Sequence, residues 1–191
     1  MRIIQKINQI VDLLFGMEII KTRPKEAVKF AKKYFKGREV IAIEIGILDG
    51  KNSKGILRNL DVKRIYLIDP YEKYTGYEKD ADHLNLKLAE KISKKRLEKY
   101  HQKIVWIKEL SEKGIKKIKE MVDFIYVDGN HEYDYVMKDL ILGWKILKKE
   151  GVLSGHDIQY SGVSRAVLDF AKKKNLDVNF GERRDWWFIK N

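Results

Sequence analysis

Residues 40–53 read VIAIEIGILDGKNS, an apolar run that leads into a turn with two glycines and then into helix-like sequence. Glycine lets a chain turn tightly and lets a ligand approach the backbone closely. The pattern therefore predicts a strand over 40–45 and a ligand-binding loop at Gly46 and Gly50. Leu48 stands where the dinucleotide fingerprint needs its second glycine, and the Lys-Ser/Thr ending of a P-loop is missing, which disfavours a pyrophosphate ligand.

Strand-like and helix-like segments alternate along the rest of the chain. The predicted strands cover residues 40–45, 64–69, 104–107, 122–128 and 151–156, and the predicted helices cover 53–60, 79–100, 112–121, 133–149 and 161–174. Such alternation is typical of βαβ units, with helices on both faces of a parallel sheet and ligands at the carboxyl ends of the strands.

Two further apolar runs, at 177–180 and 186–189, predict a terminal antiparallel pair joined by a charged turn at 181–185. The expected fold is an α/β, Rossmann-like three-layer sandwich, with a mostly parallel seven-stranded sheet and a terminal antiparallel strand. A chain of 191 residues fits one domain. We expect a helical lead-in over 1–38, with one helix over 1–20 and a second that starts near Pro24, and a Rossmann-like core over 39–191.

The composition narrows the possible partners. The chain has no cysteine, which excludes disulfides, a thiolate nucleophile and Cys-ligated metals. No apolar run is long enough for a transmembrane helix, so we expect a cytoplasmic protein without a membrane partner. The net charge of +12 could attract nucleic acid. Much of the basic excess lies in 21–38 and 91–103, however, on helices with apolar stripes, and we interpret it as a solvated surface.

An acidic residue closes the second predicted strand. Asp69 lies 23 residues after Gly46, close to the spacing at which a carboxylate binds the two hydroxyls of a ribose in doubly wound folds. Because a pyrophosphate is disfavoured, an adenosine without phosphates is the ligand that fits.

At these residues the chain resembles the class I S-adenosylmethionine-dependent methyltransferases, and the resemblance runs from Val40 to the C-terminus. Residues 44–50 are similar to the first motif of that superfamily, residues 66–70 (YLIDP) to the second, and residues 109–111 (ELS) to the segment that lines the adenine. Residues 122–133 (VDFIYVDGNHEY), Asp139-Leu140 and 151–157 (GVLSGHD) resemble a subfamily of small O-methyltransferase-like domains with an I-D-G-D-H-x-Y block.

The resemblance implies S-adenosylmethionine as the cofactor, with Glu44 near its methionine part and Asp69 at its ribose. The implied cofactor-binding residues are Glu44, Gly46, Gly50, Asp69, Ser111 and Asp128. Three alternatives stay open at this point. Asp69 could be only a strand terminator before Pro70. Glu44 could be a strand-end carboxylate bound by neighbouring backbone amides, and Ser111 could be only a helix N-cap.

Asp128 and Asp157 each close a predicted strand. Because neighbouring parallel strands end at the same edge of a sheet, we expect the two carboxylates to converge. Hard divalent ions such as Mg²⁺ bind carboxylate and amide oxygens, so Asp128 and Asp157 are the predicted metal ligands, with Asn130 as a further candidate. The subfamily often has a second acid where this chain has Asn130, and metal-dependent relatives can have Asp in place of His156, and both departures weaken the metal hypothesis.

His131 and His156 flank these aspartates, and either could be the general base for an acceptor hydroxyl. The predicted catalytic residues are therefore Asp128, His131 and His156. In the alternative, structural interpretation, His131 caps the following helix and His156 bonds a backbone carbonyl. Residues 129–132 also match the central motif of metallophosphoesterases, but the chain has four histidines and none of the other ligand blocks that such two-metal sites need.

The predicted function is transfer of a methyl group from S-adenosylmethionine to an oxygen of a small molecule or glycan, with Mg²⁺, another divalent metal or a histidine base activating the acceptor. The alternatives are an RNA methyltransferase that uses the basic surface, although nucleic acid is the less expected partner, and a non-catalytic domain that binds an adenosine ligand. The tyrosine-rich stretch with Tyr71, Tyr74 and Tyr77 predicts a specificity loop or lid.

Overall fold

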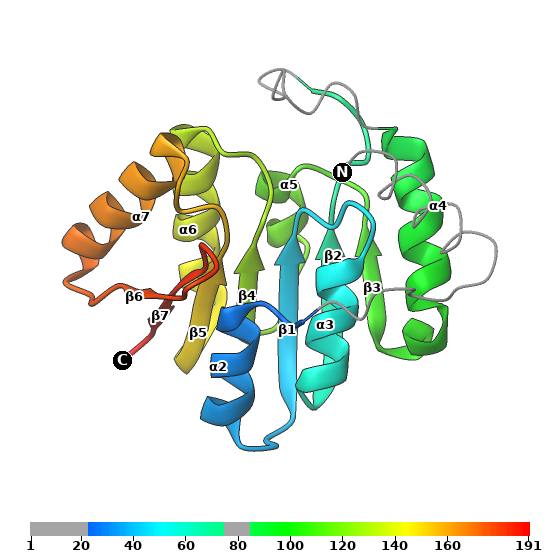
Figure 1. The fold of residues 1–191 in the computed structure, drawn as a ribbon, viewed down its shortest axis with the longest axis horizontal. Coiled ribbons are helices and arrows are strands. Elements are labelled where there is room, and N and C mark those ends of the chain that lie inside the picture. Colours follow the sequence, from blue (N-terminus) through cyan, green and yellow to red (C-terminus); the bar gives the residue numbers. More distant parts are fainter. Residues whose placement is uncertain (1–22, 75–84) are drawn as a thin grey trace.

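The computed structural model describes residues 23–74 and 85–191, and it contains a seven-stranded sheet in the order β3-β2-β1-β4-β5-β7-β6 (Figure 1). Five strands run parallel: β1 (Val40–Ile45), β2 (Val62–Ile68), β3 (Ile104–Ile107), β4 (Val122–Val127) and β5 (Leu147–Gly155). The strand β7 (Trp186–Ile189) pairs antiparallel with both β5 and β6 (Asn179–Phe180). The predicted fold class and the terminal antiparallel pair are confirmed.

Helices cover both faces of the sheet, as Figure 1 shows. One layer holds α2 (Glu26–Phe35), α3 (Lys51–Asn59) and α4 (Leu86–Leu97), followed by the 3₁₀ helix η2 (Glu98–Lys103). The other holds α5 (Ser111–Lys116), α6 (Tyr133–Ile146) and α7 (Ser161–Lys174). Alternate side chains of the central strand β4 pack into the two cores, one on each face of the sheet. Phe124 and Tyr126 join the core under α2 to α4, whereas Ile125 and Val127 join the core under α5 to α7.

Several predicted helix ends differ from the observed ones. The helix α4 begins at Leu86, because the Asn85 side chain caps it by accepting from the Leu88 N–H at 3.0 Å, and it gives way to η2 after Leu97. The helix α5 ends at Lys116 and not at 121.

The helix α6 ends at Ile146, three residues before the predicted end, because Leu147 already pairs with Val122 in the sheet. The ammonium group of Lys190 donates to the carbonyl oxygens of Trp144 and Leu147, each at 2.7 Å, and so binds the last turn of this helix. The predicted helix over 1–20, Tyr77 and residues 79–84 of the predicted helix over 79–100 lie outside the described residues.

The order of the strands determines where a ligand can bind. From β1 the chain builds β2 and β3 on one side and returns to build β4 and β5 on the other, so β1 and β4 are neighbours at a topological switch point. Ligands of open α/β sheets bind at the carboxyl ends of such strands. Among the described helices, none combines the length and the apolar character that crossing a bilayer requires.

One glycine of the sheet gives a direct test of this packing. A Cβ atom on Gly155, at the end of β5, would lie 2.6 Å from the carbonyl oxygen of Val127 and would also collide with the Trp186 ring. We expect Gly155→Ala to lower the free energy of unfolding by about 1–3 kcal/mol, measured by urea denaturation. In α3, the Cβ of Gly55→Ala meets only Asn52 at 4.0 Å, and this control should gain up to about 1 kcal/mol. An unchanged unfolding midpoint in Gly155→Ala would contradict the packing described here.

Candidate functional site

The loop after β1 lies directly against the end of β4. Gly46 has a φ of +82°, and a Cβ there would lie 2.7 Å from the Cα of Gly129 and would collide with the Asp128 carbonyl. Only glycine fits this close approach. Gly50, with a φ of +75°, is the N-cap residue of α3 and packs on Ser93. Gly50 does not line the site cavity described below, and its left-handed backbone conformation is the one that the turn into α3 requires.

Asp69 holds this loop in place from the end of β2. Its Oδ2 accepts hydrogen bonds from the backbone N–H groups of Ile47 and Leu48 at 2.8 and 3.0 Å, and its Oδ1 accepts from the Tyr71 N–H at 2.8 Å. A carboxylate offers about four lone-pair positions, so these bonds leave room for about one further donor. The sequence spacing predicted a partner for both hydroxyls of a ribose, whereas the observed geometry favours one.

Glu44 is buried at the end of β1 and faces α3. Its carboxyl group accepts from the Asn52 side-chain amide at 3.0 Å and from the Ser53 hydroxyl. The backbone-amide alternative considered from the sequence is therefore wrong, because side chains of α3 provide the partners. Burial raises the pKa of Glu44 to about 8, with the Ser53 and Asn52 hydrogen bonds acting in the opposite direction.

A second buried acid is Asp139 on α6, which contacts Ser111. Ser111 is the first residue of α5, but Leu110 is the N-cap, so the capping alternative for Ser111 is not what the structure shows. The Ser111 hydroxyl instead donates to the carboxyl group of Asp139 on α6. Burial raises the pKa of Asp139 to about 7, opposed by the Ser111 hydrogen bond. Asp139 belongs to the residues that resemble the O-methyltransferase-like subfamily, but that resemblance did not indicate a contact between Asp139 and Ser111.

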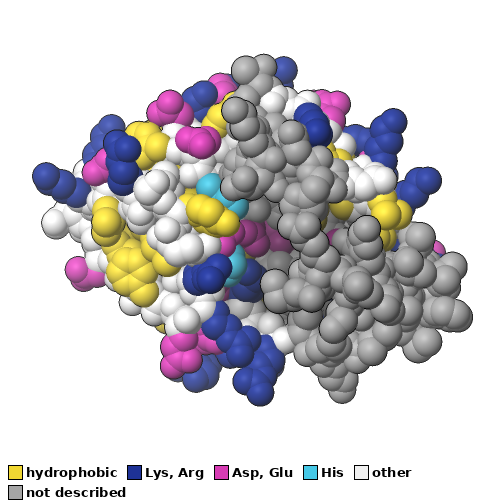
Figure 2. Space-filling model, turned by 45° about the horizontal axis from the view of Figure 1, so that its top comes forward, with side chains coloured by type: hydrophobic (Ala, Val, Ile, Leu, Met, Phe, Trp, Pro, Cys, Tyr) yellow, Lys and Arg dark blue, Asp and Glu magenta, His cyan; other side chains and the backbone are white. Residues whose placement is uncertain are grey.

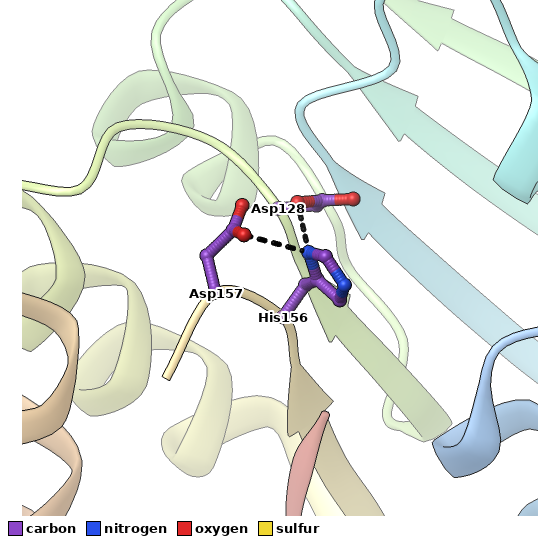
Figure 3. Close-up of side chains that lie close together, drawn as sticks. All are labelled: Asp128, His156 and Asp157. Carbon is purple, nitrogen blue, oxygen red and sulfur yellow. Dashed lines mark ion pairs between the residues drawn. The ribbon is translucent and has the colours of Figure 1, made fainter. Parts of the chain in front are cut away.

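The predicted acid and histidine cluster forms at the ends of β4 and β5 (Figure 3). The Nδ1 atom of His156 lies 3.0 Å from Asp157 Oδ1 and 3.7 Å from Asp128 Oδ1. The other oxygen of Asp157 lies 3.0 Å from Nε2 of His131. The His131 ring stacks on Tyr160, with ring centroids 4.3 Å apart. The structure therefore brings together all four residues of the predicted cluster.

Acceptor atoms surround both ring nitrogens of His156. Opposite the two aspartates, Nε2 lies 3.1 Å from the carbonyl oxygen of Arg183 and 3.8 Å from Oδ1 of Asp185. The carbonyl contact is the one that the structural interpretation of His156 predicted. Burial lowers the pKa of His156, but the hydrogen bond to Asp157 and the charge of Asp128 outweigh it, so the pKa is raised overall.

The two aspartates differ in their electrostatics. Burial raises the pKa of Asp128, with Lys25 and His156 partly offsetting this. Burial also acts to raise the pKa of Asp157, but hydrogen bonds from His131, His156 and Gln159 hold it well below its usual range. Asp157 therefore stays ionised and is the permanent negative charge of the cluster.

The same cluster fits a metal ion. One ligand atom each from Asp128, His156 and Asp157 lies within 4.8 Å of the others. If Nδ1 of His156 is a ligand, its Nε2–H donates to the Arg183 carbonyl, the arrangement typical of metal-bound histidines. Asn130, by contrast, uses its side-chain oxygen to accept from the Glu132 N–H at 2.7 Å, so the structure does not bring it in as a ligand.

Two charged residues of the site lie in segments that the sequence indicated as exposed. Asp185 is fully buried and accepts hydrogen bonds from the Ala27 N–H at 2.8 Å and the Tyr126 hydroxyl at 3.0 Å. Nζ of Lys25 lies 4.0 Å from Oδ2 of Asp128. Asp185 was part of a predicted charged turn and Lys25 part of a predicted solvated helix face, so no local signal distinguished them.

These side chains surround a cavity of about 1020 Å³ at the carboxyl ends of the strands. Figure 2 shows histidine and acidic side chains together near the centre of this face, with Lys and Arg side chains beside them. The predicted site residues that line the cavity are Glu44, Gly46, Asp69, Ser111, Asp128, His131 and His156. Asp157 does not line it and contacts both histidines from behind.

Comparison with known proteins adds independent findings. Residues 43–158 match a family profile described as a methyltransferase domain. Protein R132 of Acanthamoeba polyphaga mimivirus is 24% identical over 157 residues, which span 81% of this chain and 67% of that protein.

Two solved structures are similar in fold. A candidate caffeoyl-CoA O-methyltransferase from Staphylococcus aureus has a TM-score of 0.66 at 14% identity, over 100% of this chain and 91% of its own. A candidate methyltransferase from Streptococcus mutans, solved in complex with SAH, has a TM-score of 0.64 at 12% identity, over 88% of this chain and 100% of its own.

The contacts of His156 can be tested by NMR titration of the imidazole signals in protein treated with a chelator. We expect His156 to titrate above its usual 6.5, so its stabilising contribution is complete below pH 6.5 and is lost as pH rises through the folded-state pKa. Asp157→Asn should lower that pKa, whereas Asp61→Asn, which alters an exposed carboxylate, should not. An unchanged His156 titration in Asp157→Asn would contradict this account of the cluster.

Proposed function

This chain belongs to the methyltransferase domain family, and from that premise we propose that it transfers a methyl group from S-adenosylmethionine to an oxygen atom of a small-molecule or glycan acceptor. The observation that carries the proposal is the cluster of Asp128, His131, His156 and Asp157, whose first three members line the same cavity as the glycine loop. That arrangement provides a place for the cofactor and, next to it, groups that can take a proton from an acceptor.

The residues around the glycine loop fit the cofactor. Gly46 allows the ligand to approach the backbone, and Asp69 has about one lone-pair position left for a ribose hydroxyl. Glu44 offers a carboxyl group for the methionine part, and Ser111 lines the cavity at the place that we assign to the adenine. When bound, S-adenosylmethionine supplies a methyl group that its sulfonium already activates. The task of this chain is to align the acceptor, which can contribute roughly 7–11 kcal/mol of the barrier.

The acceptor oxygen must also lose its proton. A divalent metal held by Asp128, His156 and Asp157 would lower the pKa of an acceptor hydroxyl. Without a metal, we assign the base to His131. Both histidines line the cavity, and both nitrogens of His156 contact acceptor atoms, Nε2 the Arg183 carbonyl and Nδ1 Asp157. Asp157 would then orient His131 through their 3.0 Å contact and stabilise its protonated form.

Asp69 provides the test of cofactor binding. Calorimetry with S-adenosylhomocysteine should show binding by the wild type and a roughly 10- to 100-fold loss in Asp69→Asn, as expected for one charge-assisted hydrogen bond. Asp61→Asn is the matched control and should bind normally. Thermal melts without ligand show whether the loop held by Asp69 has shifted. If the wild type shows no binding, the proposed function is wrong.

Metal binding can be measured without knowing the acceptor. We expect protein loaded with S-adenosylhomocysteine to bind Mn²⁺, seen by electron paramagnetic resonance, and the double variant Asp128→Asn, Asp157→Asn to lose that ion. Asp61→Asn should keep it, and chelation should leave the affinity for S-adenosylhomocysteine nearly unchanged. Absence of Mn²⁺ binding by the wild type would favour the histidine mechanism. In that case His131→Ala should lower kcat by about 10²–10⁴-fold, once an acceptor is found among hydroxylated compounds.

A further inference from the structure

We propose that the acceptor carries an oxyanionic group, a carboxylate or a phosphate, that binds Lys25 on the acceptor side of the cavity. The inference rests on the proposed function and names the class of its substrate. It starts from the position of Lys25, which lines the cavity beside Asp128.

Lys25 is poised to bind a further anion. Its Nζ lies 4.0 Å from Oδ2 of Asp128, at the outer limit of an ion pair, and its side chain is 29% exposed. Within residues 23–74 and 85–191, Lys25 has no side-chain hydrogen bond in addition to this ion pair. An ammonium group carries three donors, so its capacity is largely unused although it lies beside the reacting groups.

The backbone around Lys25 is held rigidly. The Lys25 carbonyl accepts from the Lys29 N–H at 3.1 Å in the first turn of α2. The buried carboxylate of Asp185 binds the N–H of Ala27 at 2.8 Å, and Phe30 stacks on Trp187 with ring centroids 4.9 Å apart. A charged group on such a fixed backbone loses less conformational freedom when it binds a ligand.

The negative charges of the neighbouring acids, Asp128 and Asp157, already face positive or proton-donating groups. Asp157 contacts His131 with one oxygen and His156 with the other. Asp128 lies between His156 and Lys25. An incoming anion therefore meets carboxylates that face positive or proton-donating groups, and not an open negative surface.

Other basic residues reinforce the positive character of this side. Arg23 and Arg183 line the same cavity, and the Arg183 carbonyl accepts from His156. They come from opposite ends of the described chain and line the same cavity as Asp128, and Figure 2 shows Lys and Arg side chains beside the hollow. Lys51, which lines the cavity near the glycine loop, is different because it is paired with Asp49 at 2.8 Å. Arg23 and Arg183 therefore accompany Lys25 among the basic residues of the cavity.

The test uses the full chain loaded with S-adenosylhomocysteine, in a chelator, with inorganic phosphate and malonate as probes. We expect at least one probe to bind saturably in calorimetry. Lys25→Ala should weaken that binding at least tenfold, and Lys25→Arg should restore most of it. Arg183→Ala should cause a smaller loss. Lys63→Ala removes an exposed lysine that pairs with Glu39 at 3.6 Å near the start of β2, and it should change nothing.

The outcomes separate this inference from the proposed function. If S-adenosylhomocysteine does not bind, the proposed function is wrong and the acceptor assignment falls with it. If it binds but neither probe binds, or Lys25→Ala binds both as tightly as the wild type, only the oxyanion inference is overturned. Binding of an RNA oligonucleotide without binding of the small probes would also overturn it, in favour of a nucleic-acid acceptor. A preference for phosphate or for malonate would show which kind of oxyanion the acceptor carries.

Discussion

The contact between the ends of β1 and β4 is the constraint on which the site depends. The N–H of Asp128 donates to the Ile45 carbonyl at 2.8 Å, and the absence of a side chain at Gly46 lets the two backbones come together. One junction therefore positions both halves of the site. In the function that we propose, the loop that follows β1 forms the cofactor side, and the carboxylate that follows β4 forms the acceptor side. Any side chain at position 46 would separate them.

A second constraint connects the ends of the described chain to this junction. Asp185 follows the turn between β6 and β7, yet its buried carboxylate binds the start of α2 and the hydroxyl of Tyr126 in β4. The same turn provides the Arg183 carbonyl that contacts His156. The segment before β1 and the terminal hairpin thus form one wall of the site, and the position of Lys25 depends on both.

The sequence predicted the parts of the molecule that follow from strand patterns. Asp69, Asp128 and Asp157 were recognisable because they close apolar runs, and parallel strands end at one edge of a sheet. Asp185 and Lys25 could not be recognised, because whether a charge in a turn or on a helix faces inward depends on packing between distant segments. The end of α6 is a similar case, since Lys190, 46 residues after Trp144, binds its last carbonyls. Gly50 is a different case, because a glycine that a turn requires resembles in sequence one that a ligand requires.

Two buried acids with raised pKa values beside one cavity also affect the balance between stability and ligand binding. Glu44 and Asp139 have pKa values of about 8 and about 7 in the folded chain, above their usual values of 4.5 and 3.8. At a pH between the usual and the raised pKa of each group, the unfolded chain has released the proton and the folded chain has kept it. Each group therefore lowers the free energy of unfolding as pH rises through this range. The fold therefore tolerates two carboxyl groups that weaken it near neutral pH. A positively charged ligand beside them would favour their ionised forms, so protons would leave the protein as such a ligand binds, and its measured binding enthalpy would vary with the ionisation heat of the buffer.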